Sequence, residues 1–256
     1  MKLFWSYVLA CSIIFSIALS VIHGKTTINK HQSIKTGQQF NSQTAALFMP
    51  KKITKTTPLL FNSTPFIPMV DFDNLRQQYP HVVGWIVAEN TPINYPIVLG
   101  CDNDFYLRHL PDGTPHKFGA IFMDYRHHGD FSENSIFIYG HNMQSGDQFG
   151  TLRDFYSQET YEQHAPFYIY TPHANYTLTL FAGYVLDARV ATPPLMFSNE
   201  NEFDNYIHDV KTQSIFKSDI TPVFDDQLVF LCTCTNQNRH ERLVIIGILT
   251  SIPNFD

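Results

Sequence analysis

The chain has 256 residues, 44% of them hydrophobic, which is enough for one large domain or two small ones. Residues 1–70 carry seven lysines and no acidic residue. The rest of the chain therefore holds the other ten basic side chains and all 23 acidic ones, which gives it a formal net charge of −13. An acidic body of this kind argues against nucleic-acid binding as the main function.

The first predicted element is an apolar run from Leu3 to Ile22, about 20 residues, the length that spans the hydrocarbon core of a bilayer. The apolar part of a signal peptide is usually shorter, about 7–15 residues, so we expect an uncleaved transmembrane signal-anchor over residues 1–23. The alternative is a cleavable signal peptide, because Ala18 and Ser20 offer a small-x-small cleavage site. Most nearby lysines follow the run, so the positive-inside rule alone does not place the N-terminus in the cytoplasm.

Residues 24–70 are rich in Thr, Lys, Gln, Asn and Ser and show little periodicity. We expect a basic polar tether there, followed by a folded domain over residues 71–256. Asp71 is a suitable N-cap for a short helix over Phe72–Gln78, and Pro80 should end that helix.

Short β-rich runs dominate the rest of the chain. The pattern predicts eight strands, at Val82–Val87, Ile93–Val98, Gly119–Met123, Ser135–Tyr139, Tyr168–Tyr170, Tyr176–Leu186, Gln227–Cys234 and Leu243–Thr250. Helical patterns interrupt them at about Asp102–His109, Gly150–His164 and Asn201–Gln213. The predicted fold is mainly β, an eight-stranded closed or nearly closed β-barrel with several short helices, preceded by the transmembrane helix.

The four cysteines are Cys11, Cys101, Cys232 and Cys234. Cys11 lies in the apolar run, which leaves three cysteines, and this odd number is not typical of a disulfide framework. The Cys232-x-Cys234 spacing has no second pair, so no structural zinc site is expected, and a disulfide between strand residues two apart would be strained.

The last two predicted strands form a hairpin, which places Cys234 at the end of one strand beside Arg242 at the start of the next. A thiol near a fixed positive charge fits a cysteine nucleophile with a group that stabilises developing negative charge. The alternative is a cysteine that is only a small buried hydrophobic residue. Strand alternation puts Phe230, Cys232 and Cys234 on one face and Thr233 on the other.

A cysteine nucleophile needs a partner for proton transfer, and histidine is the usual one. Among twelve histidines, His141 stands out because it directly follows the predicted strand Ser135–Tyr139 and a glycine. Most of the others lie in polar stretches, and we expect those, including His127 and His128, on the solvated surface.

The end of the hairpin resembles the T-L-x-T-C pattern that closes the catalytic strand of sortases, with Phe230 in place of the first Thr. His141 and Arg242 stand at the positions of the sortase histidine and arginine. Four further segments resemble class B sortases in the family's order: Val83–Ile86, Ile93–Ile97, Asp102–Leu107 and Ala120–Arg126. The resemblance covers about residues 71–250.

The resemblance implies a cysteine transpeptidase that needs no cofactor or metal. Cys234 would attack the carbonyl of a Thr in the C-terminal sorting signal of a surface protein or pilin. His141 would be the general acid and base and Arg242 the stabiliser of the oxyanion or substrate, and the acceptor would be an amine of lipid II, the peptidoglycan cross-bridge, or a pilin lysine. The residues expected to contact substrate or line its groove are Asn103, Leu107, Tyr139, Cys232 and Thr233.

Such an enzyme, acting in cell-wall anchoring or pilus assembly, would have its catalytic domain outside the cell membrane. Two other functions stay open from the sequence alone. One is a cysteine peptidase that mainly hydrolyses its thioester, and the other is a non-catalytic barrel that binds partners at the surface.

Overall fold

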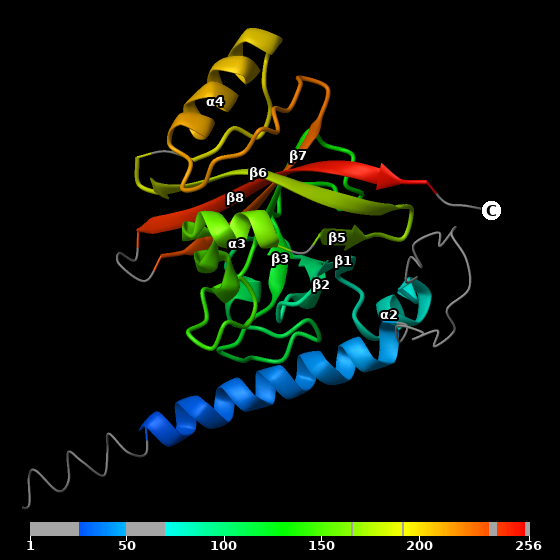
Figure 1. Cartoon of the computed structure of the whole chain (residues 1–256). Helices are drawn as coiled ribbons and strands as arrows, with labels where there is room; N and C mark the ends of the chain where they lie inside the picture. The colour runs from blue at the N-terminus through cyan, green and yellow to red at the C-terminus, as the bar shows by residue number, and fades with distance from the viewer. Residues whose placement is uncertain (1–25, 50–69, 165, 191, 236–239, 254–256) are drawn as a thin grey trace, which may run out of the picture.

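The computed structural model describes residues 26–49, 70–164, 166–190, 192–235 and 240–253 (Figure 1). The predicted signal-anchor over residues 1–23 lies outside these ranges. Within them, no helix combines the length and the apolar character needed to cross a membrane.

Eight strands close into a barrel in the order β1-β2-β3-β4-β7-β8-β6-β5, which confirms the predicted architecture (Figure 1). β2 pairs with β3, and β4 with β7, in parallel, while the other neighbours are antiparallel. The strands are β1 (Val82–Ala88), β2 (Asn94–Leu99), β3 (Ile121–Met123), β4 (Ser135–Tyr139), β5 (Phe167–Tyr170), β6 (Asn175–Asp187), β7 (Gln227–Cys234) and β8 (Glu241–Ile252).

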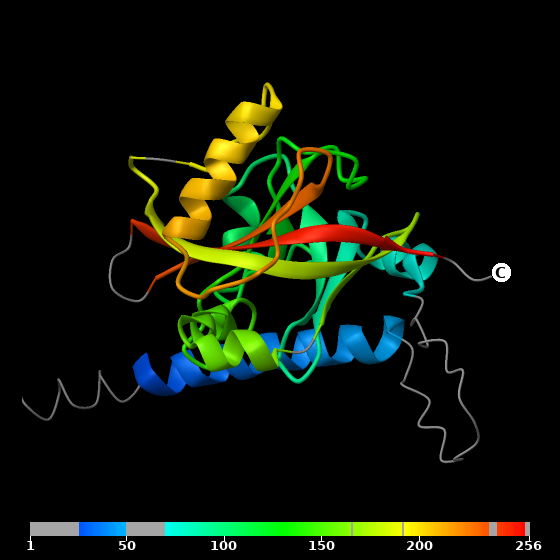
Figure 2. The same cartoon turned by 45° about the horizontal axis from the view of Figure 1, so that its top comes forward.

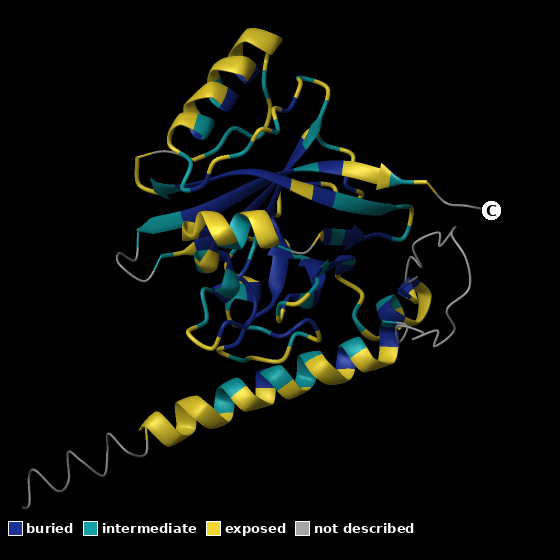
Figure 3. Cartoon of the chain, viewed as in Figure 1, coloured by how far each residue is buried: buried dark blue, intermediate teal, exposed yellow. Residues whose placement is uncertain are grey.

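Alternation along β7 and β8 places the apolar side chains of these strands in two separate core clusters. Val229, Leu231, Leu243 and Ile245 face the interior of the barrel. The intervening residues of both strands face outward into a second cluster, which α4 (Glu200–Thr212) covers with its buried face (Figure 3). The outward side of β7, which carries the predicted nucleophile at its end, is therefore packed along most of its length.

Local side-chain and backbone features set the bounds of the short helices. α2 (Phe72–Gln78) has the predicted bounds, and its N-cap Asp71 accepts a hydrogen bond from the backbone N–H of Asn74 at 3.1 Å. The pattern at Asp102–His109 yields only a 3₁₀ turn, η1 (Phe105–Leu107), because the Asp102 carboxylate caps the N–H groups of residues 104 and 105 locally. The pattern at Gly150–His164 is divided at Ser157, whose extended backbone separates η2 (Gly150–Tyr156) from α3 (Gln158–Gln163).

The predicted tether is wrong for its first half. Residues 26–48 form a helix that lies along the barrel on the side opposite to α4, as Figures 1 and 2 both show. The buried positions on this helix recur at helical spacing, at Gly37, Thr44 and Phe48, with Phe40 and Asn41 half-buried beside them. Because glycine and polar residues occupy much of that face, the run shows little hydrophobic periodicity in the sequence.

Candidate active site

Cys234 and Arg242 lie side by side at one end of the barrel. They are Cα partners at the last position of the β7–β8 ladder, as the predicted hairpin requires. Cys234 is an exposed free thiol, so a substrate can reach it. The Arg242 guanidinium donates a hydrogen bond from one terminal nitrogen to the Glu241 carbonyl at 3.0 Å, which restrains the head of the side chain at this edge.

β4 brings His141 to the same edge. β4 runs parallel to β7 with Tyr139 opposite Cys232, so each strand reaches its reactive residue two positions later. Two hydrogen bonds extend the pairing: the Gly140 N–H donates to the Cys232 carbonyl at 3.1 Å, and Asn142 Nδ2 donates to the Cys234 carbonyl at 2.7 Å. The three predicted catalytic residues therefore share one end of the sheet, although the histidine and the cysteine lie 93 positions apart in the sequence.

The imidazole of His141 is held by a backbone carbonyl. Its Nε2 lies 2.8 Å from the Leu107 oxygen, and a carbonyl oxygen can only accept, so Nε2 carries a proton. Gly119 makes room for this contact, because a Cβ there would lie 2.8 Å from the Leu107 oxygen and 3.0 Å from His141 Nε2. The half-buried Leu107 thus orients the histidine through its main chain, a role that its side-chain type could not reveal.

The backbone of His141 is fixed by Gln148, which the sequence analysis missed. This side chain is fully buried, and its Oε1 accepts the N–H of His141 at 2.8 Å. Its Nε2 donates to the Phe118 carbonyl at 2.5 Å. A glutamine in a polar loop carries no signal of such a role in a single sequence.

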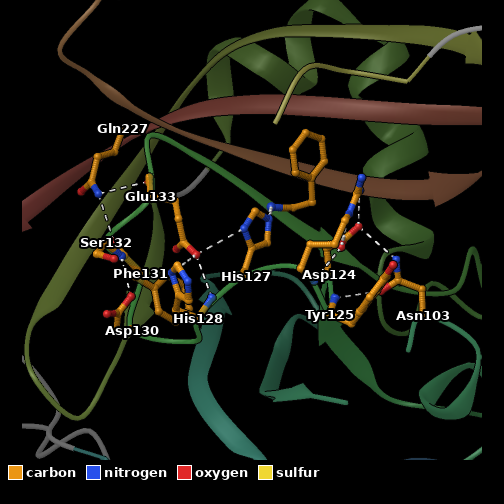
Figure 4. A network of polar contacts seen from close by, with 12 residues as sticks. Asn103, Asp124, Tyr125, His127, His128, Asp130, Phe131, Ser132, Glu133 and Gln227 are labelled. Atoms are coloured by element: carbon orange, nitrogen blue, oxygen red, sulfur yellow. Dashed lines mark hydrogen bonds and ion pairs between the residues drawn. The ribbon is translucent and has the colours of Figure 1, made fainter. Parts of the chain in front are cut away.

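Asn103 and Tyr139 meet at the buried carboxylate of Asp124. The Asn103 amide and the Tyr139 hydroxyl donate to one Asp124 oxygen at 3.0 and 2.9 Å, and Arg126 contacts both oxygens at 2.8 Å. Burial disfavours the charge, but the hydrogen bonds from Arg126, Tyr139 and Asn103 outweigh it and hold the pKa of Asp124 well below its ordinary value. Figure 4 shows the Asn103 side chain between the Asp124 carboxylate, to which its amide donates, and the Tyr125 backbone N–H, which donates to its oxygen.

Cys232 and Thr233 do not line an open groove. Cys232 is 5% exposed and lies in the cluster beneath α4, and burial raises the pKa of its thiol, which disfavours the reactive thiolate. Thr233 is also buried, on the opposite side of the strand. Both were expected at the groove, and the packing of both sides of β7 explains why neither side chain reaches it.

His127 was expected on the surface and is instead 7% exposed. Its ring is anchored between β4 and Glu133: the Phe137 N–H donates to Nε2 at 3.0 Å, and Nδ1 lies 3.6 Å from the Glu133 carboxylate (Figure 4). His128 is exposed, as predicted, and pairs with the same carboxylate at 3.1 Å. Burial lowers the pKa of His127 and keeps the ring neutral, so it serves the fold and not proton transfer.

A scan against models of protein families gives no match. Individual relatives do match: sortase B of Listeria monocytogenes is 32% identical over 180 residues, which are 70% of this chain and 73% of that protein. The crystal structure of sortase B from B. anthracis, 27% identical, matches 87% of this chain and 100% of its own with a TM-score of 0.72.

A structure described as a Staphylococcus aureus sortase B–substrate complex, 25% identical, matches 71% of this chain and 85% of its own with a TM-score of 0.67. The Listeria match covers more than two thirds of both proteins, and the B. anthracis structure is matched over its full length. The chain belongs to the sortase B family of cysteine transpeptidases.

Proposed function

We propose that the enzyme cleaves a C-terminal sorting signal after a Thr residue and transfers the acyl group, through a thioester on Cys234, to an amine. The observation that carries this proposal is the convergence of Cys234, His141 and Arg242 at the shared end of β4, β7 and β8. The substrate complex of the Staphylococcus relative supports it, because a similar barrel was solved with a substrate bound.

The reaction needs one nucleophile and one proton carrier. The Cys234 thiolate attacks the Thr carbonyl, a C–S bond forms, and the C–N bond breaks as the His141 imidazolium protonates the leaving amine. An incoming amine then attacks the thioester, gives its proton to His141 and releases Cys234. Because the Leu107 carbonyl holds the Nε2–H, Nδ1 is the ring nitrogen that exchanges these protons.

Arg242 stabilises the negative charge that develops on the carbonyl oxygen at each attack. Its position opposite Cys234 in the ladder and its bond to the Glu241 carbonyl support this role. A guanidinium offers planar, paired donors, which the point charge of a lysine cannot copy. Arg242→Lys should therefore lose most of the transfer activity, and near-normal turnover by that variant would disprove the oxyanion role.

The other residues that were predicted to contact substrate surround the three catalytic residues. Asn103 and Tyr139 are engaged with Asp124, and Leu107 offers a half-buried side chain next to the carbonyl that holds His141. We propose that these three residues shape the surface on which the sorting signal lies, while Cys232 and Thr233 support it from beneath.

The apolar run over residues 3–22 fits an anchor that keeps the catalytic barrel at the outer surface of the cell membrane. The acceptor is then an amine displayed there, on lipid II or the peptidoglycan cross-bridge for wall anchoring, or on a pilin lysine for pilus assembly. Fractionation with protease treatment of intact cells tests this placement, because an external barrel is digested without lysis.

The reaction is tested with a library of peptides that carry Thr at the scissile position, with and without an added amine such as triglycine or a lysine amide. Mass spectrometry should show an acyl adduct on Cys234 and an amine-dependent product, both absent in Cys234→Ala and reduced in His141→Ala. A hydrolysis product alone identifies a cysteine peptidase. No adduct with any peptide, or an adduct unaffected by His141→Ala, refutes the catalytic assignment.

A further inference from the structure

The loop that carries His141 is closed on itself. Asn142 and Gln148 form an isolated bridge, and the Phe149 N–H donates to the His141 carbonyl at 3.1 Å. Gln148 adopts a positive φ of 49°, a conformation that costs energy for a residue other than glycine and persists only where surrounding contacts hold it. The position of His141 therefore depends on what holds Gln148 and its neighbour.

The neighbour is Asp147, an 8% exposed carboxylate. It accepts hydrogen bonds from Ser145 Oγ at 2.5 Å and from Gln38 Nε2 at 2.7 Å, and the Tyr95 hydroxyl lies 3.5 Å away. A buried carboxylate requires such donors, since leaving it unsatisfied is costly. Ser145 belongs to the loop itself, whereas Gln38 comes from helix 26–48, more than a hundred positions earlier in the chain.

The same helix reaches the other support of Gln148. Gly37 faces Phe118, where any Cβ would collide with the phenyl ring, and the Phe118 carbonyl accepts the Gln148 side chain. One turn of the helix thus contacts Asp147 and Phe118, two of the groups that hold Gln148 in place. The third is the Tyr95 hydroxyl, which accepts the Gln148 backbone N–H at 3.0 Å. Three residues further along the helix, on the same face, Asn41 donates to the Asn94 carbonyl at 3.1 Å and so anchors the helix to β2.

We propose that helix 26–48 is a positioning element of the active site, in which Gln38 holds the Asp147 carboxylate and, through Gln148, fixes the backbone of His141. The route has three steps: Gln38 to Asp147, the peptide link to Gln148, and the Gln148 side chain to the His141 N–H. Gln38 is a positioning residue, because it acts on the histidine only through the loop. The inference rests on the proposed role of His141.

The test uses readouts that need no sorting signal. In the ¹⁵N-histidine-labelled full chain, the ring nitrogens of His141, assigned by their loss in His141→Gln, report whether the proton stays on Nε2. Iodoacetamide alkylation of Cys234, followed peptide by peptide across a pH series, reports how the histidine supports the thiolate. The variants are Gln38→Ala, Gln38→Glu and, as the matched control on the same helix face, Asn41→Ala.

In Gln38→Ala we expect the His141 nitrogen signals to shift toward an average of both tautomers, and Cys234 alkylation near neutral pH to slow about threefold to tenfold, the equivalent of roughly one hydrogen bond. Gln38→Glu should act more strongly, because it places a second carboxylate against Asp147. Asn41→Ala should leave both readouts near wild type. The double variant Gln38→Glu with Asp147→Asn restores a donor–acceptor pair and should recover a large part of the loss.

Wild-type His141 signals and alkylation in Gln38→Ala overturn the proposal, as do equal losses in Gln38→Ala and Asn41→Ala. A double variant no better than Gln38→Glu alone overturns the direct route through Asp147. Because neither readout involves transfer to an amine, failure of the transfer reaction leaves this test intact, and a negative result here leaves the transfer reaction untouched.

Discussion

Gly119→Ala is a direct test of the contact that holds the His141 imidazole. Gly119 has a φ of +62°, and its missing side chain makes room for the contact between His141 Nε2 and the Leu107 carbonyl. A methyl group there would approach both groups at once. The substitution therefore tests whether that hydrogen bond orients the histidine for catalysis.

The size of the effect follows from the contacts. A Cβ at Gly119 would lie 2.8 Å from the Leu107 oxygen and 3.0 Å from His141 Nε2, so restoring a separation of 3.4 Å requires shifts of 0.6 and 0.4 Å. A misplacement of about 1 Å can lower a catalytic rate about 100-fold, so we expect a loss of about 10- to 100-fold in kcat. The positive φ adds a backbone cost of about 1–2 kcal/mol to the free energy of folding.

Gly113→Ala is the matched control. Gly113 also has a positive φ, +81°, but a Cβ there meets no atom within 4 Å. Gly113→Ala should lose only the backbone cost of its positive φ, whereas Gly119→Ala should lose more stability in urea unfolding, because its Cβ also meets the Leu107 and Tyr106 carbonyl oxygens at 2.8 Å. Only Gly119→Ala should lose activity in the peptide transfer assay. Equal activities of the two variants at temperatures where both are folded would show that the Leu107–His141 bond does not orient the histidine.

Three further predictions concern the buried groups around the site. Cys232→Ala should retain transfer activity and lose about 1–2 kcal/mol of stability in urea unfolding, whereas Cys234→Ala should abolish transfer, since only the second thiol is exposed. Asp124 has a pKa lowered from 3.8, so its stabilisation is complete above that value and declines as the pH falls further; Asp124→Asn should reduce this part of the acid dependence of unfolding. Burial lowers the pKa of His127 below 6.5 despite the nearby carboxylates of Glu133 and Asp124, so the folded protein should lose stability as the pH falls below about 6.5. In urea unfolding, His127→Gln should reduce this loss of stability between pH 7.5 and pH 5.

The sequence by itself determined most of the strands and the pairing of Cys234 with Arg242. Alternation and turn residues gave β4 and β7 their observed bounds, and the hairpin rule placed Cys234 beside Arg242. These features depend on neighbours within one strand or across one turn, where local pattern and pairing leave few alternatives. His141 was singled out by its place directly after a predicted strand and then by the family resemblance, and the parallel pairing of β4 with β7 explains how it reaches the edge where Cys234 lies.

The tertiary structure alone decided what surrounds these residues. Gln148 and the Leu107 carbonyl hold His141, yet neither contact depends on a periodic pattern. Cys232 was placed on the right face of β7, but only the docking of α4 made that face an interior one. Helix 26–48 reaches the surroundings of the histidine loop through a glycine and a polar side chain, Gly37 and Gln38, so this contact emerges only once the barrel gives them their partners.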